Sequence, residues 1–125
     1  MSDPQTTRLG IPVYTPIQLV ISGSTSAVID LDFSDPGGFV VGRSDSKSSY
    51  TPDIDLSAHR ALENGVSRRH AALIQYQDML HLLDLNSVNG TQINGERLSA
   101  ELPYLICPND QILLGSLALT IEVRR

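Results

Sequence analysis

Large apolar residues alternate with polar ones along much of the chain, with the period of two that is typical of β-strands. The clearest case is residues 117–123, in which every second residue from Leu117 to Val123 is large and apolar. Residues 17–21 show the same alternation and end at a Ser-Gly-Ser sequence. Turn signals recur about every eight to twelve residues and no segment sustains a helical period, so the pattern predicts an all-β sandwich or barrel.

Shorter apolar segments predict the other strands. They are residues 28–33, 39–42, 54–56, 91–93, 96–98, 102–106 and 111–114. Asn94-Gly95 is a two-residue turn of the kind that needs positive φ, and a second turn is expected at residues 35–38. Within the longest irregular stretch, residues 44–64, Ser57 as N-cap and Gly65 as C′ predict one helical turn over residues 58–63.

The central feature of the predicted fold is a β-hairpin. Residues 71–76 and 79–85 are two apolar segments that are separated only by Gln77-Asp78, which is the length and punctuation of an antiparallel hairpin. A hairpin returns the chain to its starting end. The loops at residues 64–70 and 86–90 should therefore lie side by side, with Ser67 and Arg68 facing Asn89.

Length and composition predict one domain. The 125 residues are enough for one core and too few for two. Residues 1–16 contain three prolines and no periodicity, so we expect a flexible arm outside the core and a folded domain over residues 17–125. The longest apolar runs are four residues, against the ~20 of a membrane-spanning helix, and residues 1–10 do not resemble a signal peptide. The single cysteine, Cys107, fits a reducing cytoplasm.

The charge distribution favours a small anionic ligand over nucleic acid. The net charge is −5, but residues 43–70 hold five cations and four acids, a local balance of +1. General nucleic-acid binding relies on a positive field, and no aromatic residues are interleaved with the basic ones to stack on bases. A locally basic spot on an acidic chain suits a single phosphate.

Three motifs in order give the chain a family resemblance. They are Gly42-Arg43, then Ser67-Arg68-Arg69-His70, then Ser87-Val88-Asn89-Gly90-Thr91 with Asn94-Gly95 behind it. Over residues 17–123 this arrangement resembles a forkhead-associated (FHA) domain. The resemblance implies a sandwich of two twisted antiparallel sheets with about eleven strands and with the ligand loops at one end.

The resemblance also implies how a phosphorylated threonine would be bound. Arg43 can donate two parallel hydrogen bonds to a phosphate, Ser67 offers a hydroxyl, and Arg68 offers a backbone or guanidinium contact. Asn89 can pair with the peptide backbone beside the phosphorylated residue. Val88 is a departure, because similar domains commonly carry a threonine there; its methyl groups are expected to line a pocket for the threonine γ-methyl.

Gly42, His70 and Gly90 are interpreted as loop architecture. The two glycines allow tight backbone geometry at the loop roots. His70 is a possible catalytic base, but at a loop-to-strand junction we favour hydrogen bonds to neighbouring backbone that hold the Ser67 loop. The resemblance agrees with that structural role.

Three functions are compatible with the sequence. The first is a phosphothreonine-binding module in Ser/Thr kinase signalling, with a phosphorylated protein as partner, no membrane or nucleic-acid partner and no cofactor. The second is a docking domain of the same fold that ignores phosphate. The third, a hydrolase using Ser67 and His70, lacks an evident orienting acid and oxyanion hole, so we predict no enzyme. His59 and His81 lack metal-ligand spacing, and no metal site is expected.

Overall fold

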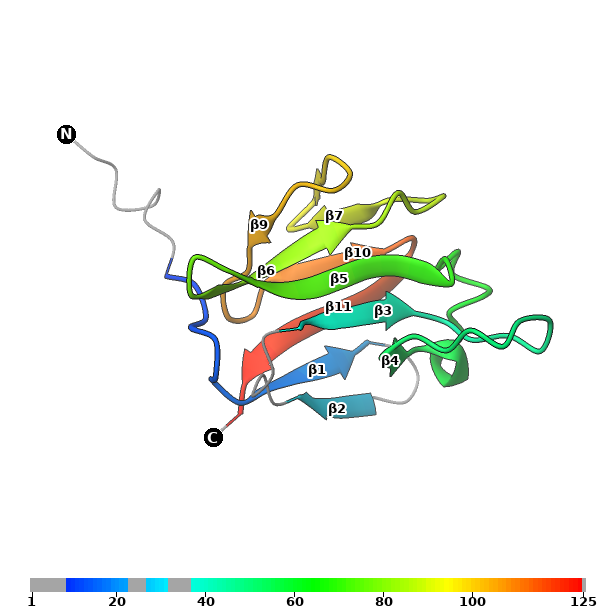
Figure 1. Ribbon diagram of the computed structural model, residues 1–125, viewed down its shortest axis with the longest axis horizontal. Helices are drawn as coiled ribbons and strands as arrows, with labels where there is room; N and C mark the ends of the chain where they lie inside the picture. Colours follow the sequence, from blue (N-terminus) through cyan, green and yellow to red (C-terminus); the bar gives the residue numbers. More distant parts are fainter. Residues whose placement is uncertain (1–8, 23–26, 32–36, 125) are drawn as a thin grey trace.

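The computed structural model describes residues 9–22, 27–31 and 37–124, and these residues form eleven strands and one 3₁₀ turn (Figure 1). The strands are β1 (Ile17–Ile21), β2 (Ala27–Leu31), β3 (Phe39–Gly42), β4 (Ile54–Asp55), β5 (Arg69–Tyr76), β6 (Met79–Asp84), β7 (Thr91–Ile93), β8 (Glu96–Arg97), β9 (Tyr104–Leu105), β10 (Gln111–Leu114) and β11 (Leu117–Val123). The 3₁₀ turn η2 covers Ser57–His59. The all-β prediction is therefore confirmed.

The strands form two sheets that pack as a sandwich. The six-stranded sheet has the order β2-β1-β11-β10-β7-β8, and the five-stranded sheet has the order β4-β3-β5-β6-β9. All the paired strands are antiparallel except β3 and β4, which are parallel. The second sheet therefore contains one parallel pair in an otherwise antiparallel sandwich, the fold class that the resemblance implied.

Alternation along the strands builds the core between the sheets. In β1, Ile17, Leu19 and Ile21 are each at most 2% exposed, while the residues between them are half-buried. All five residues of β1 pair with residues 119–123 of β11, which contributes Leu119 and Ile121 to the same cluster. Strands that are buried on one face and covered with polar groups on the other carry this period of two.

Both predicted two-residue turns are present. In the β5–β6 hairpin, Gln77 and Asp78 have φ of 53° and 63°, and in the β7–β8 hairpin Asn94 and Gly95 have φ of 51° and 84°. Two successive positive φ values are the geometry that matches the right-handed twist of the flanking strands. The β5–β6 hairpin thus brings its two flanking loops to one end of the sandwich, as predicted.

Part of the segment expected to be a flexible arm belongs to the core. Ile11 is 1% exposed, Val13 is buried, and the Ile11 carbonyl accepts a hydrogen bond of 2.8 Å from the backbone N–H of Leu80. The prediction that residues 1–16 lie outside the core is therefore wrong for Ile11 and Val13. Ile11 and Leu80 belong to the same buried cluster, so the segment adds apolar surface to the core.

The strand prediction at residues 102–106 was too long, and the one at residues 28–33 is tested only in part. β2 ends at Leu31, and the remainder of the predicted strand, residues 32–33, lies outside the described residues. β9 covers only Tyr104–Leu105, because it pairs with β6 through just two residues. Residues 35–36, half of the turn predicted at residues 35–38, also lie outside the described residues.

The helical turn is shorter than expected and is capped differently. It covers Ser57–His59, the residue before it is Leu56, and no side chain caps it. It ends because Arg60 adopts the left-handed conformation with φ of 61°. The side chain of Asp55 accepts the Ser57 backbone N–H at 3.0 Å, so Ser57 is held from outside the turn. No described segment forms a helix with the length and apolar character needed to cross a membrane.

Candidate functional site

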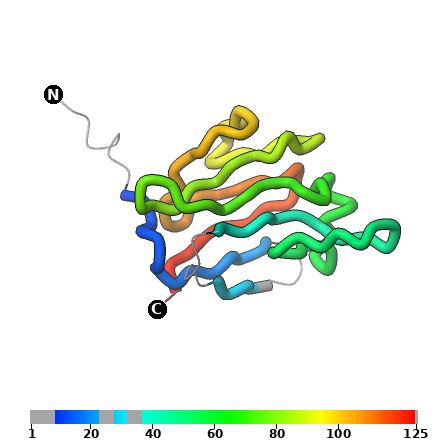
Figure 2. Tube along the Cα trace, in the orientation of Figure 1, coloured from blue at the N-terminus to red at the C-terminus, as the bar shows by residue number. Residues whose placement is uncertain are grey.

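Three loops come together at one end of the sandwich, opposite the first and last described residues. Figure 2 shows the segment after β3, the loop before β5 and the loop after β6 at this end. They contain all five residues predicted to bind a phosphopeptide: Arg43, Ser67, Arg68, Val88 and Asn89. The middle loop, residues 64–68, makes the contacts that join the other two.

Arg43 follows directly after β3, and its side chain lies against the middle loop. Its Nε donates to the Val66 carbonyl at 2.7 Å, and its Nη1 contacts the Asp45 carboxylate at 3.2 Å. The side chain is only 17% exposed. Two of the five guanidinium N–H groups are used in these contacts, which leaves three donors for an anion.

The loop after Arg43 is fixed at its root by Asp55 of β4. The Asp55 carboxylate accepts the backbone N–H groups of Ser44 at 2.9 Å and of Ser57 at 3.0 Å, and it also accepts the Ser44 hydroxyl. Partial burial opposes ionisation, but the hydrogen bonds from Ser44 and Ser57 outweigh it and lower the pKa of Asp55 to about 2. An ionised Asp55 thus holds the chain just beyond Arg43.

Ser67 and Val88 connect the middle loop to the loop after β6. The backbone N–H of Val88 donates to Ser67 Oγ at 3.2 Å, so the Ser67 oxygen acts as an acceptor there. Within the described part of the chain no acceptor takes the Ser67 hydroxyl proton, which is available to a ligand oxygen. The Val88 side chain is 83% exposed beside it.

Asn89 makes a second connection between the same two loops. Its Nδ2 donates to the Gly65 carbonyl at 3.0 Å, and the residue is exposed. Gly65 has φ of 77°, and a Cβ at this position would come within 2.5 Å of Asn89 Nδ2, so glycine is required for the close approach. The Asn89 carbonyl oxygen and its second amide N–H remain available to a peptide backbone.

His70 is fully buried under the two loops and makes two hydrogen bonds to neighbouring backbone. The Ser67 backbone N–H donates to His70 Nδ1 at 2.9 Å, which makes Nδ1 the acceptor and places the proton on Nε2. Nε2 then donates to the Gly90 carbonyl at 2.9 Å. Burial lowers the pKa of the His70 imidazole, so the ring stays neutral and keeps this tautomer near neutral pH.

Asp84, at the end of β6, holds the Val88 and Asn89 loop from below. Its Oδ1 accepts the hydroxyls of Ser87 at 2.6 Å and Thr91 at 2.7 Å, and its Oδ2 accepts the Ser87 backbone N–H at 3.2 Å. The Ser87 oxygen in turn accepts the Gly90 N–H at 3.0 Å. Asp84 is 4% exposed, so these bonds replace the water that a buried carboxylate would otherwise need.

Gly42 and Gly90 allow close backbone approaches at the loop roots. A Cβ on Gly42 would collide with the Arg68 carbonyl oxygen, which accepts the Arg43 backbone N–H at 3.2 Å. Gly90 has φ of 85°, which favours glycine. Gly42 therefore provides space and Gly90 provides a left-handed turn.

Two acidic residues at the site were missed by the sequence analysis. Asp84 lies in the pattern Asp-x-x-Ser at the end of a strand, and that spacing is a possible signal for a side chain that bonds a following turn. Asp45 comes two residues after Arg43 and contacts both Arg43 and Arg68, the latter at 3.8 Å from Arg68 Nε. The only feature of the sequence that could have placed Asp45 at the site is its nearness to Arg43 in the chain.

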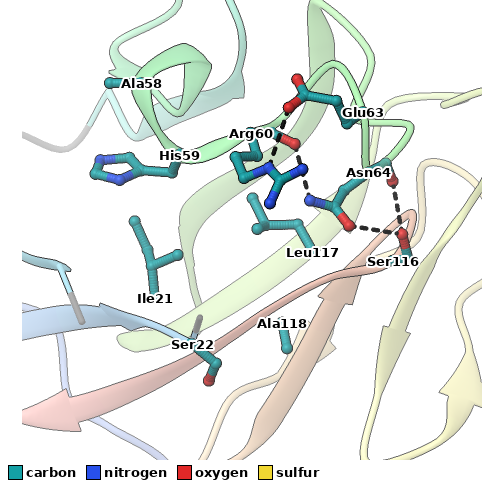
Figure 3. Close-up of a pocket in the computed structure, with 10 residues that line it drawn as sticks. All are labelled: Ile21, Ser22, Ala58, His59, Arg60, Glu63, Asn64, Ser116, Leu117 and Ala118. Atoms are coloured by element: carbon teal, nitrogen blue, oxygen red, sulfur yellow. Dashed lines mark hydrogen bonds and ion pairs between the residues drawn. The ribbon is translucent and has the colours of Figure 1, made fainter. Parts of the chain in front are cut away.

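A hollow on the described surface lies beside these loops and shares only Asn64 with the middle loop. It has a volume of about 620 Å³ and lies between η2 and the end of the β1–β11 pair (Figure 3). Asn64 and Ser116 close one side of it through a hydrogen bond of 3.0 Å, and Arg60 contacts Glu63 across its rim. None of the five predicted binding residues lines it, so this hollow is not the candidate site.

The described residues include no group of three or more His, Cys, Asp and Glu side chains arranged to hold a metal ion. What the loops offer is a set of hydrogen-bond donors: the guanidinium groups of Arg43 and Arg68, the Ser67 hydroxyl and the Asn89 amide. Charged donors in a fixed arrangement favour an oxyanion such as a phosphate or a carboxylate. An arrangement of this kind can hold an oxyanion at the end of the sandwich.

Comparison with known proteins agrees with the fold. No protein of curated function matches the sequence. Among solved structures, the chain is similar to the N-terminal FHA domain of S. cerevisiae RAD53P in complex with a phosphothreonine peptide, at 21% identity and a TM-score of 0.68, covering 87% of this chain and 94% of that one. A domain studied for phosphothreonine-dependent FHA interactions has 23% identity and a TM-score of 0.66, covering 89% and 99%.

A third similar structure is the FHA domain of FhaA in complex with the intracellular domain of Rv3910. It has 24% identity and a TM-score of 0.63, covering 85% of this chain and 99% of that one. The sequence itself matches the family model of the FHA domain over residues 39–115, which is more than half of the chain and includes all three loops. This protein belongs to the FHA domain family.

Proposed function

We propose that this domain binds a partner protein that is phosphorylated on threonine. Arg43, Ser67 and Arg68 hold the phosphate, and Asn89 holds the peptide backbone next to it. The partner becomes a ligand after a Ser/Thr protein kinase has acted on it, and the domain works as an interaction module in cytoplasmic signalling without catalysis of its own.

The observation that carries the proposal is the convergence of these four side chains on one set of interlocked loops. Val66 fixes the Arg43 guanidinium, the Val88 backbone N–H fixes the Ser67 oxygen, and Gly65 fixes the Asn89 amide. Each anchoring bond leaves other donors of the same side chain available. Preorganised donors of this kind bind an anion without having to be ordered first.

Charge and hydrogen-bonding capacity favour phosphate as the ligand. A phosphate monoester carries about two negative charges near neutral pH and has three strong acceptor oxygens. Charge-assisted hydrogen bonds contribute ~1.5 to 3 kcal/mol each, and the ordering of a peptide offsets part of this. We expect dissociation constants in the micromolar range.

Calorimetric titration with phosphothreonine, phosphoserine and threonine versions of one peptide tests the proposal. The phosphothreonine peptide should bind with micromolar affinity and the threonine peptide should not bind. The γ-methyl beside Val88 should favour phosphothreonine over phosphoserine by a few-fold, because a buried methyl is worth ~0.8 kcal/mol. Equal affinity for all three peptides would instead favour a docking domain that ignores phosphate.

A further inference from the structure

The Asp45 carboxylate lies against both arginines that the proposed function assigns to the phosphate. Its Oδ2 is 3.2 Å from Arg43 Nη1 and 3.8 Å from Arg68 Nε. The Asp45 side chain is 27% exposed and the Arg43 side chain is 17% exposed, so this contact is shielded in part from water. One negative oxygen is thus shared by the two guanidinium groups that an incoming phosphate would use.

The Asp45 carboxylate is fixed in this position by its own loop. Its Oδ1 accepts the Lys47 backbone N–H at 2.9 Å, which orients Oδ2 toward the arginines. This backbone bond and the Arg43 guanidinium lower the pKa of Asp45 below its usual value. Asp45 is therefore ionised at any pH near neutral, and the arginine pair is already partly neutralised.

An anion beside the arginine pair opposes the binding of a second anion. A phosphate that contacts Arg43 and Arg68 must either displace Oδ2 from them or lie next to a charge of its own sign. Both routes weaken binding, the first by competition for the same N–H donors and the second by repulsion. Neither route affects an unphosphorylated peptide that does not reach the arginines.

We propose that Asp45 is an internal competitor for the phosphate site, an autoinhibitory contact that sets the affinity of the domain for its ligand. The inference rests on the proposed function, since it assumes that phosphate binds at Arg43 and Arg68. Asp45 keeps the arginine pair occupied until a ligand with more charge and more acceptor oxygens than a carboxylate arrives. Weaker anions, such as an acidic side chain on a chance partner, then bind too poorly to be retained.

The test replaces Asp45 with asparagine in the full chain. Asp45→Asn keeps the oxygen that accepts the Lys47 N–H and removes the negative charge. Asp78→Asn is the matched control, because it removes the same charge from an exposed residue of the β5–β6 turn at the opposite end of the sandwich. Asp45→Ser is a second variant in case the new amide group distorts the loop, and thermal melts check that all of the variants fold.

Calorimetric titration compares the phosphothreonine and threonine versions of one peptide on each protein. Asp45→Asn should bind the phosphopeptide roughly threefold or more tightly than the wild type, Asp45→Ser should also bind it more tightly, and Asp78→Asn should match the wild type. The threonine peptide should remain without affinity for every variant.

Three results would overturn the inference, and one of them also overturns the proposed function. Unchanged phosphopeptide affinity in both Asp45 variants would show that the carboxylate does not compete. Weaker affinity in both would make Asp45 a support that positions Arg43. If neither the wild type nor the Asp45 variants bound the phosphopeptide, the proposed function would fail together with the inference.

Discussion

The two ends of the sandwich are held together by different chemistry. At the end with the β5–β6 turn, backbone groups bond to one another: Leu80 N–H donates to the Ile11 carbonyl at 2.8 Å, and Ile106 N–H donates to the Leu80 carbonyl at 3.1 Å. The side chains of these three residues are apolar and at most 1% exposed. At the other end, backbone bonds such as that from the Arg43 N–H to the Arg68 carbonyl are supplemented by polar side chains that join one loop to the next.

This difference shows where residue identity matters. A backbone-to-backbone bond forms with almost any residue, provided that the chain is extended and its apolar side chains are covered. The contacts of His70, Asp84 and Asn89 each require one particular side chain. A fold that only needed to close its end would not require such specific groups, whereas a site that holds a ligand needs its donors fixed in place.

The largest expected effect is on stability at the apolar end. Ile11→Ala should lower the free energy of unfolding by about 3 kcal/mol, because truncation of a fully buried isoleucine loses apolar contact and leaves a cavity. For a domain of this size that is a fall in melting temperature of roughly 12 °C. Thermal melts measure the loss, with the exposed Leu9→Ala as a control that should change little.

The same variant also tests whether the two ends of the sandwich are coupled. Below its melting temperature, Ile11→Ala should bind a phosphothreonine peptide as the wild type does, since Ile11 bonds to Leu80 beside the β5–β6 turn, at the end opposite the loops. A marked loss of affinity in the folded variant would mean that the two ends are coupled.

The second prediction concerns binding at the loop end. Arg43→Ala should reduce phosphopeptide affinity at least about a hundredfold, since two charge-assisted hydrogen bonds would be lost. Its cost in stability should stay near 1 kcal/mol, the value of the single bond to the Val66 carbonyl. Titration and a melt measure the two effects, and Arg124→Ala removes the same charge near the end of β11 as a control. Wild-type affinity in Arg43→Ala would remove Arg43 from the site.

The third prediction is a pH dependence that comes from His70. Because burial lowers its pKa in the folded state, the unfolded chain binds the proton more readily. The stability contributed by neutral His70 is complete above about pH 6.5, the usual pKa of histidine, and is lost as the pH falls from there through the folded pKa. A protonated Nδ1 would face the Ser67 N–H, donor against donor.

Thermal melts of the wild type and of His70→Ala between pH 5 and 8 measure this pH dependence of stability. At pH 8 the variant should be less stable than the wild type by roughly 1 to 2 kcal/mol, with a smaller effect on phosphopeptide affinity. The difference in stability between the two proteins should become smaller at low pH. His59→Gln is the control, since among the described residues His59 makes no side-chain hydrogen bond. An unchanged melt together with abolished binding would contradict the structural role of His70.

The smallest expected effect is at Val88. Val88→Thr adds a hydroxyl next to the Ser67 oxygen and should tighten phosphopeptide binding by up to ~1 kcal/mol, the value of one bond from a neutral donor. Stability should be unchanged because the side chain is exposed. Titration should also show no new affinity for the unphosphorylated peptide. Weaker phosphopeptide binding would indicate that the valine methyl groups contribute more than a hydroxyl can.

Regular alternation and turn chemistry made most of the fold predictable. β1, β11 and the two hairpins follow from the period of two and from residues that accept positive φ. The meeting of the Ser67 and Asn89 loops followed from the hairpin between them, without any knowledge of the contacts. Local sequence carries this information because strand periodicity and turn geometry are set by neighbouring residues.

Contacts between separate segments were not predictable in the same way. Ile11 lies in a proline-rich stretch without periodicity, and its burial depends on the position of Leu80. β4 has two residues, and its parallel pairing with β3 leaves no pattern. Asp45 and Asp84 look like ordinary turn acids until the fold brings donors to them. A resemblance supplied the binding roles, which the residue pattern alone did not specify.

The central claim is that the interlocked loops bind phosphate, and amide chemical shifts test it most directly. A ¹⁵N-labelled domain is titrated with the phosphothreonine peptide and, in parallel, with the unphosphorylated peptide. The account predicts that only the phosphopeptide shifts the amides of residues 43–48, 65–68 and 86–90, while Gln77, Asp78 and the outer sheet residues stay unchanged. Shifts on a sheet face that are the same for both peptides would contradict the account and identify a docking domain that ignores phosphate.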